Sequence, residues 1–171
     1  MTDAVPRPAP ELADPKELLL GYLDYYRSVI ARKLNGLTEA ELRSSHLPSG
    51  WTPLELLKHL VHMEARWLRW GFMAEQLPQP WGDEDESGRW HVDPEETATE
   101  LLASLHAGGA RTRAIAAGAE LTDVAAVGGR FTVGDHRPTL AWILFHVLQE
   151  YARHAGHLDI TRERLDGATG E

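Results

Sequence analysis

The chain has 171 residues, a formal net charge of −9, no cysteine and nine histidines. This length suffices for a well-packed core, and the lack of cysteine excludes disulfides, thiolate metal sites and iron–sulfur clusters. An acidic chain is poorly suited to nucleic acid, and no apolar run approaches the roughly 20 residues of a membrane span. Its first residues lack the pattern of a signal peptide, so we expect a cytoplasmic protein.

The first half of the chain predicts a tail and two long helices. Residues 1–13 are rich in proline and alanine, and we expect them to form a mobile tail. A first helix is predicted from the N-cap residue Asp14 to a stop signal at Asn35. A second is predicted from Thr52, which opens a capping box followed by proline, to about Gln76.

The second half of the chain predicts two more helices. The third is expected to open at Asp93, where acidic residues suit the positive end of the helix dipole. Gly108 and Gly109 weaken its centre, so we expect a bend or an early end there. A glycine-rich stretch, 121–137, precedes a fourth helix predicted over about 138–165.

Four amphipathic helices with almost no strand signal predict an all-α protein, a single antiparallel four-helix bundle over residues 14–171. The connections between the second and third helices and between the third and fourth are long, and long loops in a compact domain are often functional. The acidic run 83–86 lacks the spaced ligands of an EF-hand and is expected to be a solvated loop.

Polar residues gather on one side of the fourth predicted helix. His146, Glu150, His154 and His157 share a stripe roughly 80° wide, because each residue turns the helix by about 100°. The stripe overlaps the apolar edge of the helix, where imidazoles and carboxylates are costly unless they are paired or bind a metal. Glu150 and His154 lie one turn apart and can chelate one ion, but this spacing is common and needs a third ligand from another helix.

The second predicted helix offers two histidines as that third ligand. His59 lies about 60° from the centre of the apolar face and His62 about 120° from it. His59 is therefore the better inward ligand, and His62 is expected to point to solvent or a loop. Two histidines and one carboxylate leave open positions on a metal, as in catalytic sites. Such ligands suit zinc, nickel, manganese or iron(II), of which we favour zinc or nickel.

Other residues are candidates for supporting roles. His157 could act as an acid or base or hold a ligand in place, and His146 could line the site. Trp51, next to the capping box, could border a pocket. The remaining histidines, at positions 46, 91, 106 and 136, are expected to be solvated. The ligands alone leave open a metal-dependent hydrolase and a bundle that binds a metal or a partner without catalysis.

Two segments, 51–60 (WTPLELLKHL) and 142–159 (WILFHVLQEYARHAGHLD), resemble the DinB/YfiT-like superfamily of metal-dependent four-helix bundles, in a small actinobacterial branch. The resemblance implies that His59, Glu150 and His154 occupy the three metal-ligand positions. In having glutamate at position 150, the chain is similar to the metal-binding domain of mycothiol-dependent maleylpyruvate isomerases.

Relatives in this superfamily include transferases and isomerases that use low-molecular-weight thiols such as mycothiol, and many are dimers. The resemblance therefore implies a thiol-dependent S-transferase or isomerase with a divalent metal, a thiol cosubstrate, a small-molecule substrate and a possible homodimer. Nucleic acid and membranes are not expected as partners, because the chain is acidic and has no long apolar run. A borrowed thiol also suits a chain that has no cysteine of its own.

Overall fold

A computed structural model describes residues 6–170; residues 1–5 of the predicted tail and Glu171 lie outside the described residues. The prediction of an all-α bundle is confirmed, and among residues 6–170 only two isolated β-bridges form. No helix in this part of the chain has the length and apolar character needed to cross a bilayer. The elements are α1 (Pro15–Leu34), α2 (Glu39–Leu42), α3 (Pro53–Ala65), the π-helix η1 (Arg66–Phe72), α4 (Ala98–Ala117) and α5 (Leu140–Asp166).

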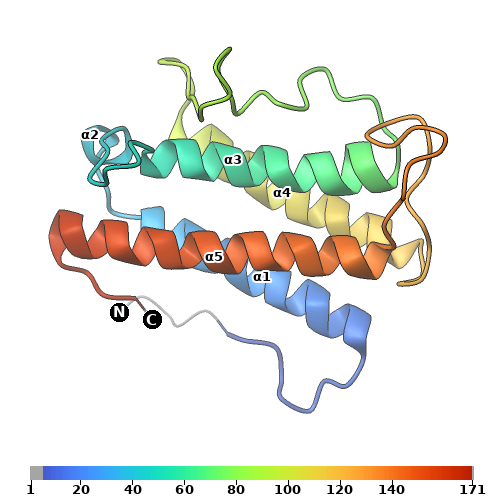
Figure 1. Cartoon of the computed structure of the whole chain (residues 1–171). Coiled ribbons are helices and arrows are strands. Elements are labelled where there is room, and N and C mark those ends of the chain that lie inside the picture. The colour runs from blue at the N-terminus through green and yellow to red at the C-terminus, as the bar shows by residue number, and fades with distance from the viewer. Residues whose placement is uncertain (1–5, 171) are drawn as a thin grey trace.

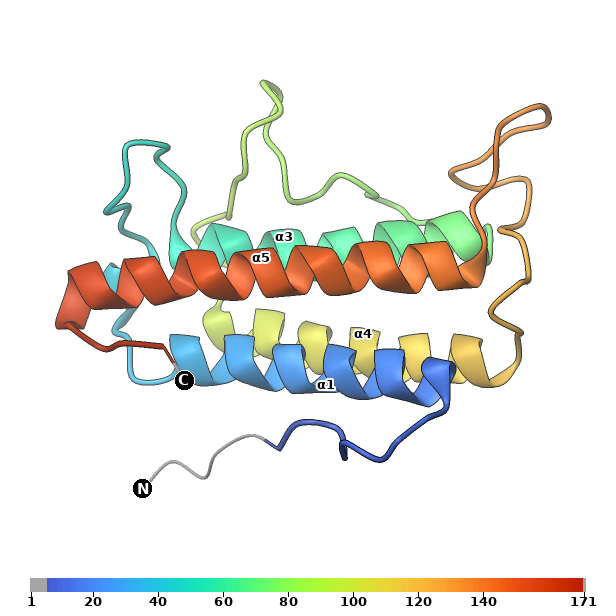
Figure 2. The ribbon, with the colours of Figure 1, turned by 60° about the horizontal axis from the view of Figure 1, so that its bottom comes forward.

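Figure 2 shows the long helices in two layers, α3 with α5 and α1 with α4, and the most extensive packing joins the layers, α1 against α5 and α3 against α4. α1 and α5 run in one direction, and α3 and α4 run in the other (Figure 1). Contacts agree with this arrangement, since Lys33 near the end of α1 pairs with Asp159 near the end of α5. Lys16 at the start of α1 donates to the carbonyl of Ala116 at the end of α4, 3.2 Å away. Because α3 and α4 are parallel, the connection 73–97 must cross the length of the bundle.

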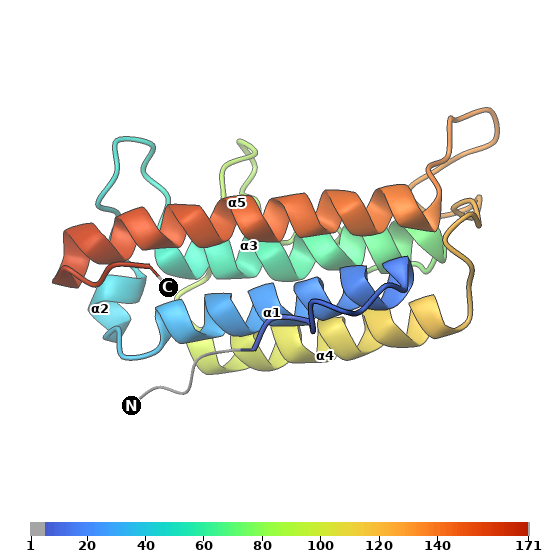
Figure 3. The same ribbon diagram turned by 90° about the horizontal axis from the view of Figure 1, so that it is seen from below.

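The described part of the predicted tail lies along α1 (Figure 3). The guanidinium of Arg7 donates to the hydroxyl of Tyr25 at 3.5 Å. Pro8 packs against Gly21, where an added Cβ would lie 2.9 Å from the Cγ of the proline. Residues 6–13 therefore pack on the first helix without being helical themselves.

Helix caps account for most of the boundaries. Asp14 and Thr52 act as the predicted N-caps of α1 and α3. The prediction that the third helix opens at Asp93 is wrong. α4 begins after Thr97, whose side chain accepts the backbone N–H of Glu100 while the glutamate side chain accepts the N–H of Thr97. This complete capping box satisfies two N–H groups, whereas the turn at Asp93 continues into no helix.

The second helix ends at Phe72 rather than near Gln76. The carbonyl of Phe72 accepts the backbone N–H of Ala126 at 2.9 Å, and the carbonyl of Trp70 accepts that of Arg130 at 3.0 Å. The segment after α4 therefore caps the end of η1. The short helix α2 was not predicted from the sequence, although Thr38 and Glu41 form a capping box at its start.

Of the bend or early end expected at Gly108 and Gly109, the early end does not occur, because α4 continues to Ala117. Gly109 faces Arg27 of α1, and a Cβ there would lie 2.9 Å from the Nε of the arginine. The glycine makes room for a buried guanidinium, and packing keeps the helix intact across the weak pair.

That guanidinium belongs to a polar network in the middle of the bundle, with one residue from each long helix. Arg27, Glu64, Thr112 and Tyr151 have exposures of at most 3%. Glu64 accepts from Arg27 Nε at 3.1 Å and from the Tyr151 hydroxyl at 2.7 Å, and the Thr112 hydroxyl also donates to it. Burial would lower the pKa of Arg27, but the charge of Glu64 and its hydrogen bonds raise it above its ordinary value.

Candidate metal centre

Three polar side chains from α3 and α5 converge on one point near the surface of the bundle. Nε2 of His154 lies 3.2 Å from Oε2 of Glu150, and Nε2 of His59 lies 4.0 Å from the same oxygen. All three ligand atoms lie within 4.8 Å of one another. Ions such as zinc sit about 2 Å from each ligand atom, so side-chain adjustments of under about 1 Å would bring the three onto one ion.

The carboxylate of Asp83 lies behind His59. Nδ1 of His59 donates to Asp83 Oδ2 at 3.0 Å, and Nη2 of Arg66 donates to the same oxygen at 3.1 Å. Burial would raise the pKa of Asp83, but the hydrogen bonds from His59 and Arg66, with the arginine charge, lower it to about 2. The ionised carboxylate fixes the tautomer of His59 and leaves Nε2 free to ligate, as carboxylates behind metal-bound histidines do.

The expectation that the run 83–86 is a solvated loop is therefore wrong at its first residue, since Asp83 is 0% exposed. The crossover 73–97 passes over α3 (Figure 1), and Asp83, one of its residues, packs next to His59. Glu84 pairs with Trp90 in an isolated bridge that closes the loop. Of the other residues of the run, Glu84 is half-buried, and Asp85 and Glu86 are exposed.

His154 is the most buried of the three candidate ligands, with its side chain 6% exposed. Burial, followed by the charges of His59, His157 and Arg153, lowers its pKa to about 3. Its imidazole is neutral at pH 7, which is the form that binds metals. Arg153 lies 3.3 Å from the other oxygen of Glu150, Oε1, and partly balances the charge of that carboxylate.

Aromatic side chains wall the centre on one side. Trp90 stacks on His59 with 4.3 Å between ring centroids, and Trp51 lies 6.4 Å from Trp90. Both tryptophans line a cavity of about 460 Å³ together with Glu55 and Arg89. The centre therefore adjoins a space of the size that small ligands occupy.

The other candidate residues lie at different distances from the ligands. The ring of His157 is in hydrogen-bond contact with His154, Nδ1 to Nδ1 at 3.2 Å, and lies 6.0 Å from Trp51. His146 lies one turn before Glu150 and stacks on Trp142 with 5.2 Å between ring centroids. It therefore contacts aromatic rings rather than the ligand atoms. The histidines at 46, 91, 106 and 136 are exposed.

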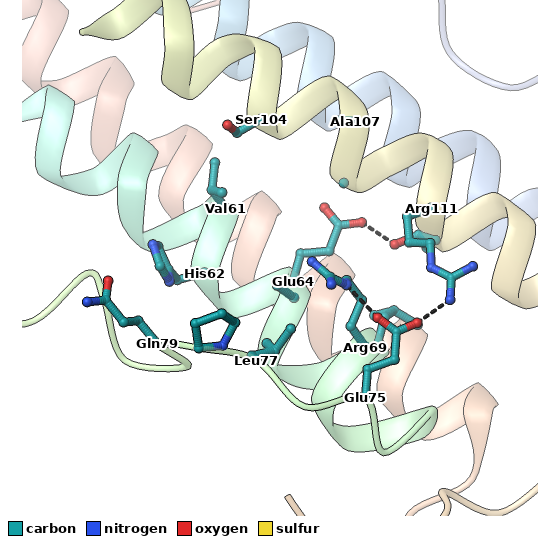
Figure 4. Close-up of a pocket in the computed structure, with 15 residues that line it drawn as sticks. Val61, His62, Glu64, Arg69, Glu75, Leu77, Gln79, Ser104, Ala107 and Arg111 are labelled. Carbon is teal, nitrogen blue, oxygen red and sulfur yellow. Dashed lines mark hydrogen bonds and ion pairs between the residues drawn. The ribbon is translucent and has the colours of Figure 1, made fainter. Parts of the chain in front are cut away.

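His62 points away from the three candidate ligands, toward the loop that ends at Gly82 and toward α4. A Cβ at Gly82 would lie 2.6 Å from the Cε1 of His62. On this side a cavity of about 650 Å³ lies between α3 and α4, with His62 and Gln79 on one side and a bridge from Glu75 to Arg69 and Arg111 on the other (Figure 4). This cavity contains none of the three candidate ligands.

Sequence reasoning missed Asp83 and Trp90. Both lie in the crossover, which has no periodicity that would place them against α3. The only local signal was an aspartate directly after a tryptophan-glycine turn, and it does not distinguish a buried carboxylate from a solvated one.

The fold and the site together define a helical bundle with a His/Glu/His cluster that could bind a metal. Residues 18–167 match the family model of mycothiol S-transferases, and the chain belongs to this family. Membership implies a transferase enzyme that uses mycothiol, and the DinB/YfiT-like resemblance is confirmed.

A conserved protein from Enterococcus faecalis, whose structure has been solved, has the same fold. The TM-score is 0.68, and the match covers 90% of this chain and 98% of that chain at 19% sequence identity. At this identity the likeness concerns the fold alone. No curated protein matches the chain at a significant level.

Proposed function

We propose that this chain conjugates mycothiol, through its sulfur, to small electrophiles at a divalent metal held by His59, Glu150 and His154. The observation that carries the proposal is the convergence of these three ligand atoms within 4.8 Å. Their chemistry fits a borderline ion such as zinc or nickel, and two imidazoles with one carboxylate leave positions for a ligand. When bound, such a metal lowers the pKa of a coordinated thiol or water, so that the thiolate is available near neutral pH.

The residues of the chain around this point have separate tasks. Asp83 orients His59 through Nδ1 at 3.0 Å, and Arg153 limits the negative charge of Glu150. His157 lies beside Trp51, and its Nδ1 accepts the Nδ1–H of His154, which keeps that neutral ligand in the tautomer whose Nε2 is free to bind the metal.

The cavity of about 460 Å³ beside Trp51 and Trp90 receives the polar body of the thiol. Aromatic faces next to carboxylate and guanidinium groups suit a hydroxyl-rich molecule, because rings stack on its C–H faces while charged groups bond its hydroxyls. Glu55 and Arg89 supply those charged groups. The absence of cysteine fits a protein whose nucleophilic sulfur comes with the cosubstrate.

Metal content and thiol conjugation test this function with one matched pair of histidine variants. His59→Ala and His62→Ala remove imidazoles three residues apart on α3, only one of which faces Glu150. We expect zinc-loaded wild type and His62→Ala to hold about one ion per chain and to conjugate mycothiol to a neutral aryl chloride. His59→Ala is expected to lose at least tenfold in metal affinity and most of the activity.

Two results would count against the proposal, each against a different part. Equal metal content in His59→Ala and wild type, measured by elemental analysis, would remove His59 from the metal site. A wild type that binds zinc but conjugates no electrophile to mycothiol would leave the metal site standing and reject the reaction.

A further inference from the structure

Arg130 carries a guanidinium that the proposed chemistry at the metal centre does not use. Its Cζ lies 4.1 Å from the ring centroid of Trp67 and 5.8 Å from that of Trp81, and the residue is half-buried. Within residues 6–170, no carboxylate forms an ion pair or hydrogen bond with it. Arg66, the neighbouring cation, is by contrast paired with Asp83.

The backbone holds Arg130 in a fixed place. Its N–H donates to the carbonyl of Trp70 at 3.0 Å, and its Cδ lies 3.7 Å from where a Cβ of Gly71 would be. Gly129 approaches η1 so closely that a Cβ there would fall 2.1 Å from the carbonyl oxygen of Trp70. The segment after α4 is thus pressed onto η1, which presents the guanidinium at a defined position.

The position is electrostatically unbalanced. Burial and the charge of Arg66 both lower the pKa of Arg130, and among the described residues no acidic side chain offsets either effect. A partly desolvated cation without a counter-charge is costly, and an anion that binds there would relieve that cost. The planar fork of arginine fits a carboxylate through two parallel hydrogen bonds.

A wall of aromatic rings leads from Arg130 to the candidate metal centre. Trp67, under the guanidinium, lies 4.5 Å from the ring of His146 between centroids. His146 stacks on Trp142 with an interplanar angle of 5° and precedes Glu150 by one helical turn. The guanidinium therefore lies on the order of 10–15 Å from the candidate ligands, which is the span of a small aromatic molecule with its thiol partner.

We propose that Arg130 binds the carboxylate of the electrophilic substrate, whose flat body lies along Trp67 and His146 with its reactive carbon toward Glu150. The inference rests on the proposed function and names the class of the second substrate, an aromatic or unsaturated electrophile that carries a carboxylate. Arg130 is a specificity-determining residue in this arrangement. The aromatic wall fits the flat body, and the unpaired guanidinium fits the charge.

Equilibrium binding tests the site without requiring turnover. The probes are 3-nitrobenzoate and 3-nitrobenzamide, which differ only in the charged group, and their binding is followed by quenching of tryptophan fluorescence. We expect wild type to bind the acid about tenfold or more tightly than the amide, because a hydrogen bond to a charged group is strong. Arg130→Gln should lose this preference, and Arg130→Lys should keep part of it.

The matched control is Arg137→Gln, which removes the same charge from the same segment. Arg137 is exposed and its guanidinium donates to the carbonyl of Ala125 at 2.6 Å. This variant should retain the preference for the acid. A wild type without that preference, or an Arg130→Gln variant that keeps it, would overturn the inference. If Arg130→Gln does not fold, wild type and Arg130→Lys still decide.

Kinetics separate this inference from the proposed function. The substrates are 4-chloro-3-nitrobenzoate and its amide, each with mycothiol; the sulfur bonds to the ring carbon, chloride leaves with the electron pair, and the thiol proton passes to solvent. Arg130→Gln should lower the acid-to-amide ratio of kcat/KM about tenfold. If wild type conjugates both compounds equally, only the inference fails. If it conjugates neither but binds nitrobenzoate through Arg130, only the transferase function fails.

Discussion

α3 and α5 carry two buried polar clusters whose hydrogen-bonding states are opposite. In the central network, both oxygens of Glu64 are occupied by donors from within the chain, namely Arg27, Thr112 and Tyr151. Nothing is left over for a ligand, and the charges balance inside the bundle. Such a saturated network contributes to stability and to the alignment of the four helices, because each partner would be costly if left alone.

The candidate metal centre lies little more than a turn away along the same helices and is unsaturated. His59 and His154 direct nitrogen atoms at one oxygen of Glu150, and within residues 6–170 only Arg153 pairs with that carboxylate as a permanent cation. Polar side chains that converge but keep lone pairs without a hydrogen-bond donor can bind a metal ion or another ligand. We therefore expect the first cluster to stabilise the bundle and the second to bind a ligand.

Glu64→Ala should cause the largest loss in the free energy of unfolding, because it removes the acceptor at the centre of the first cluster. It leaves the guanidinium of Arg27 buried with only the partly exposed Asp24 as partner. Removing one partner of a buried ion pair costs about 3–5 kcal/mol, and we expect a loss near the lower end of this range because Asp24 remains. Urea unfolding measures it.

Glu75→Ala is the control for that variant. Glu75 bridges Arg69 and Arg111 near the surface, where ion pairs contribute about 0–1 kcal/mol. A loss of stability in Glu64→Ala no larger than in Glu75→Ala would show that the central network does not stabilise the bundle.

Metal addition should affect only the second cluster. At 100 times its dissociation constant, zinc should stabilise wild type by about 2.7 kcal/mol, because the ion binds the folded chain. His154→Ala should lose this increment, whereas His106→Ala, which removes an exposed histidine of α4, should keep it. The free energy of unfolding with and without zinc measures the effect. An equal zinc increment in His154→Ala and wild type would contradict the assignment.

Asp83→Asn tests a residue that links the two kinds of cluster. Both carboxylate oxygens of Asp83 already accept hydrogen bonds, yet one of these bonds orients the candidate ligand His59. The amide can still accept from Nδ1 of His59, but it loses the charge that supports the imidazole and that balances Arg66. Groups behind metal ligands typically change metal affinity by about 10–100-fold, and we expect a loss in that range.

Competition with a chromophoric chelator measures the zinc affinity of this variant. Glu86→Gln, which removes a charge from an exposed position of the same loop, should bind zinc as wild type does. A loss of affinity in Glu86→Gln as large as in Asp83→Asn would mean that the general charge of the loop, rather than the bond to His59, acts on the metal.

Local sequence signals predicted the parts of this protein that local chemistry decides. Caps at Asp14 and Thr52 placed two helices, and the spacing of Glu150 and His154, with the helical angle of His59, selected the three side chains that converge. These features depend on neighbours within one or two turns.

Features that depend on the crossover could not be read in the same way. The parallel direction of α3 and α4 and the burial of Asp83 against α3 follow from how the segment 73–97 runs over the bundle. No period in that segment marks which side faces α3. The requirement for a glycine at position 109 of α4 likewise comes from Arg27, which lies far away in the sequence.

Gly108→Ala and Gly109→Ala give the smallest effect and test that last point. Alanine favours a helix over glycine by up to about 1 kcal/mol, so propensity alone predicts two similar gains. A Cβ at Gly108 would have its nearest neighbour, Glu64 Oε2, at an ordinary 3.9 Å, whereas a Cβ at Gly109 would lie 2.9–3.0 Å from three atoms of Arg27. Displacing an arginine that two acids hold costs about 1–3 kcal/mol. Gly108→Ala should therefore raise the thermal midpoint and Gly109→Ala should lower it; equal gains would show that the central network yields to a methyl group and does not fix the helices.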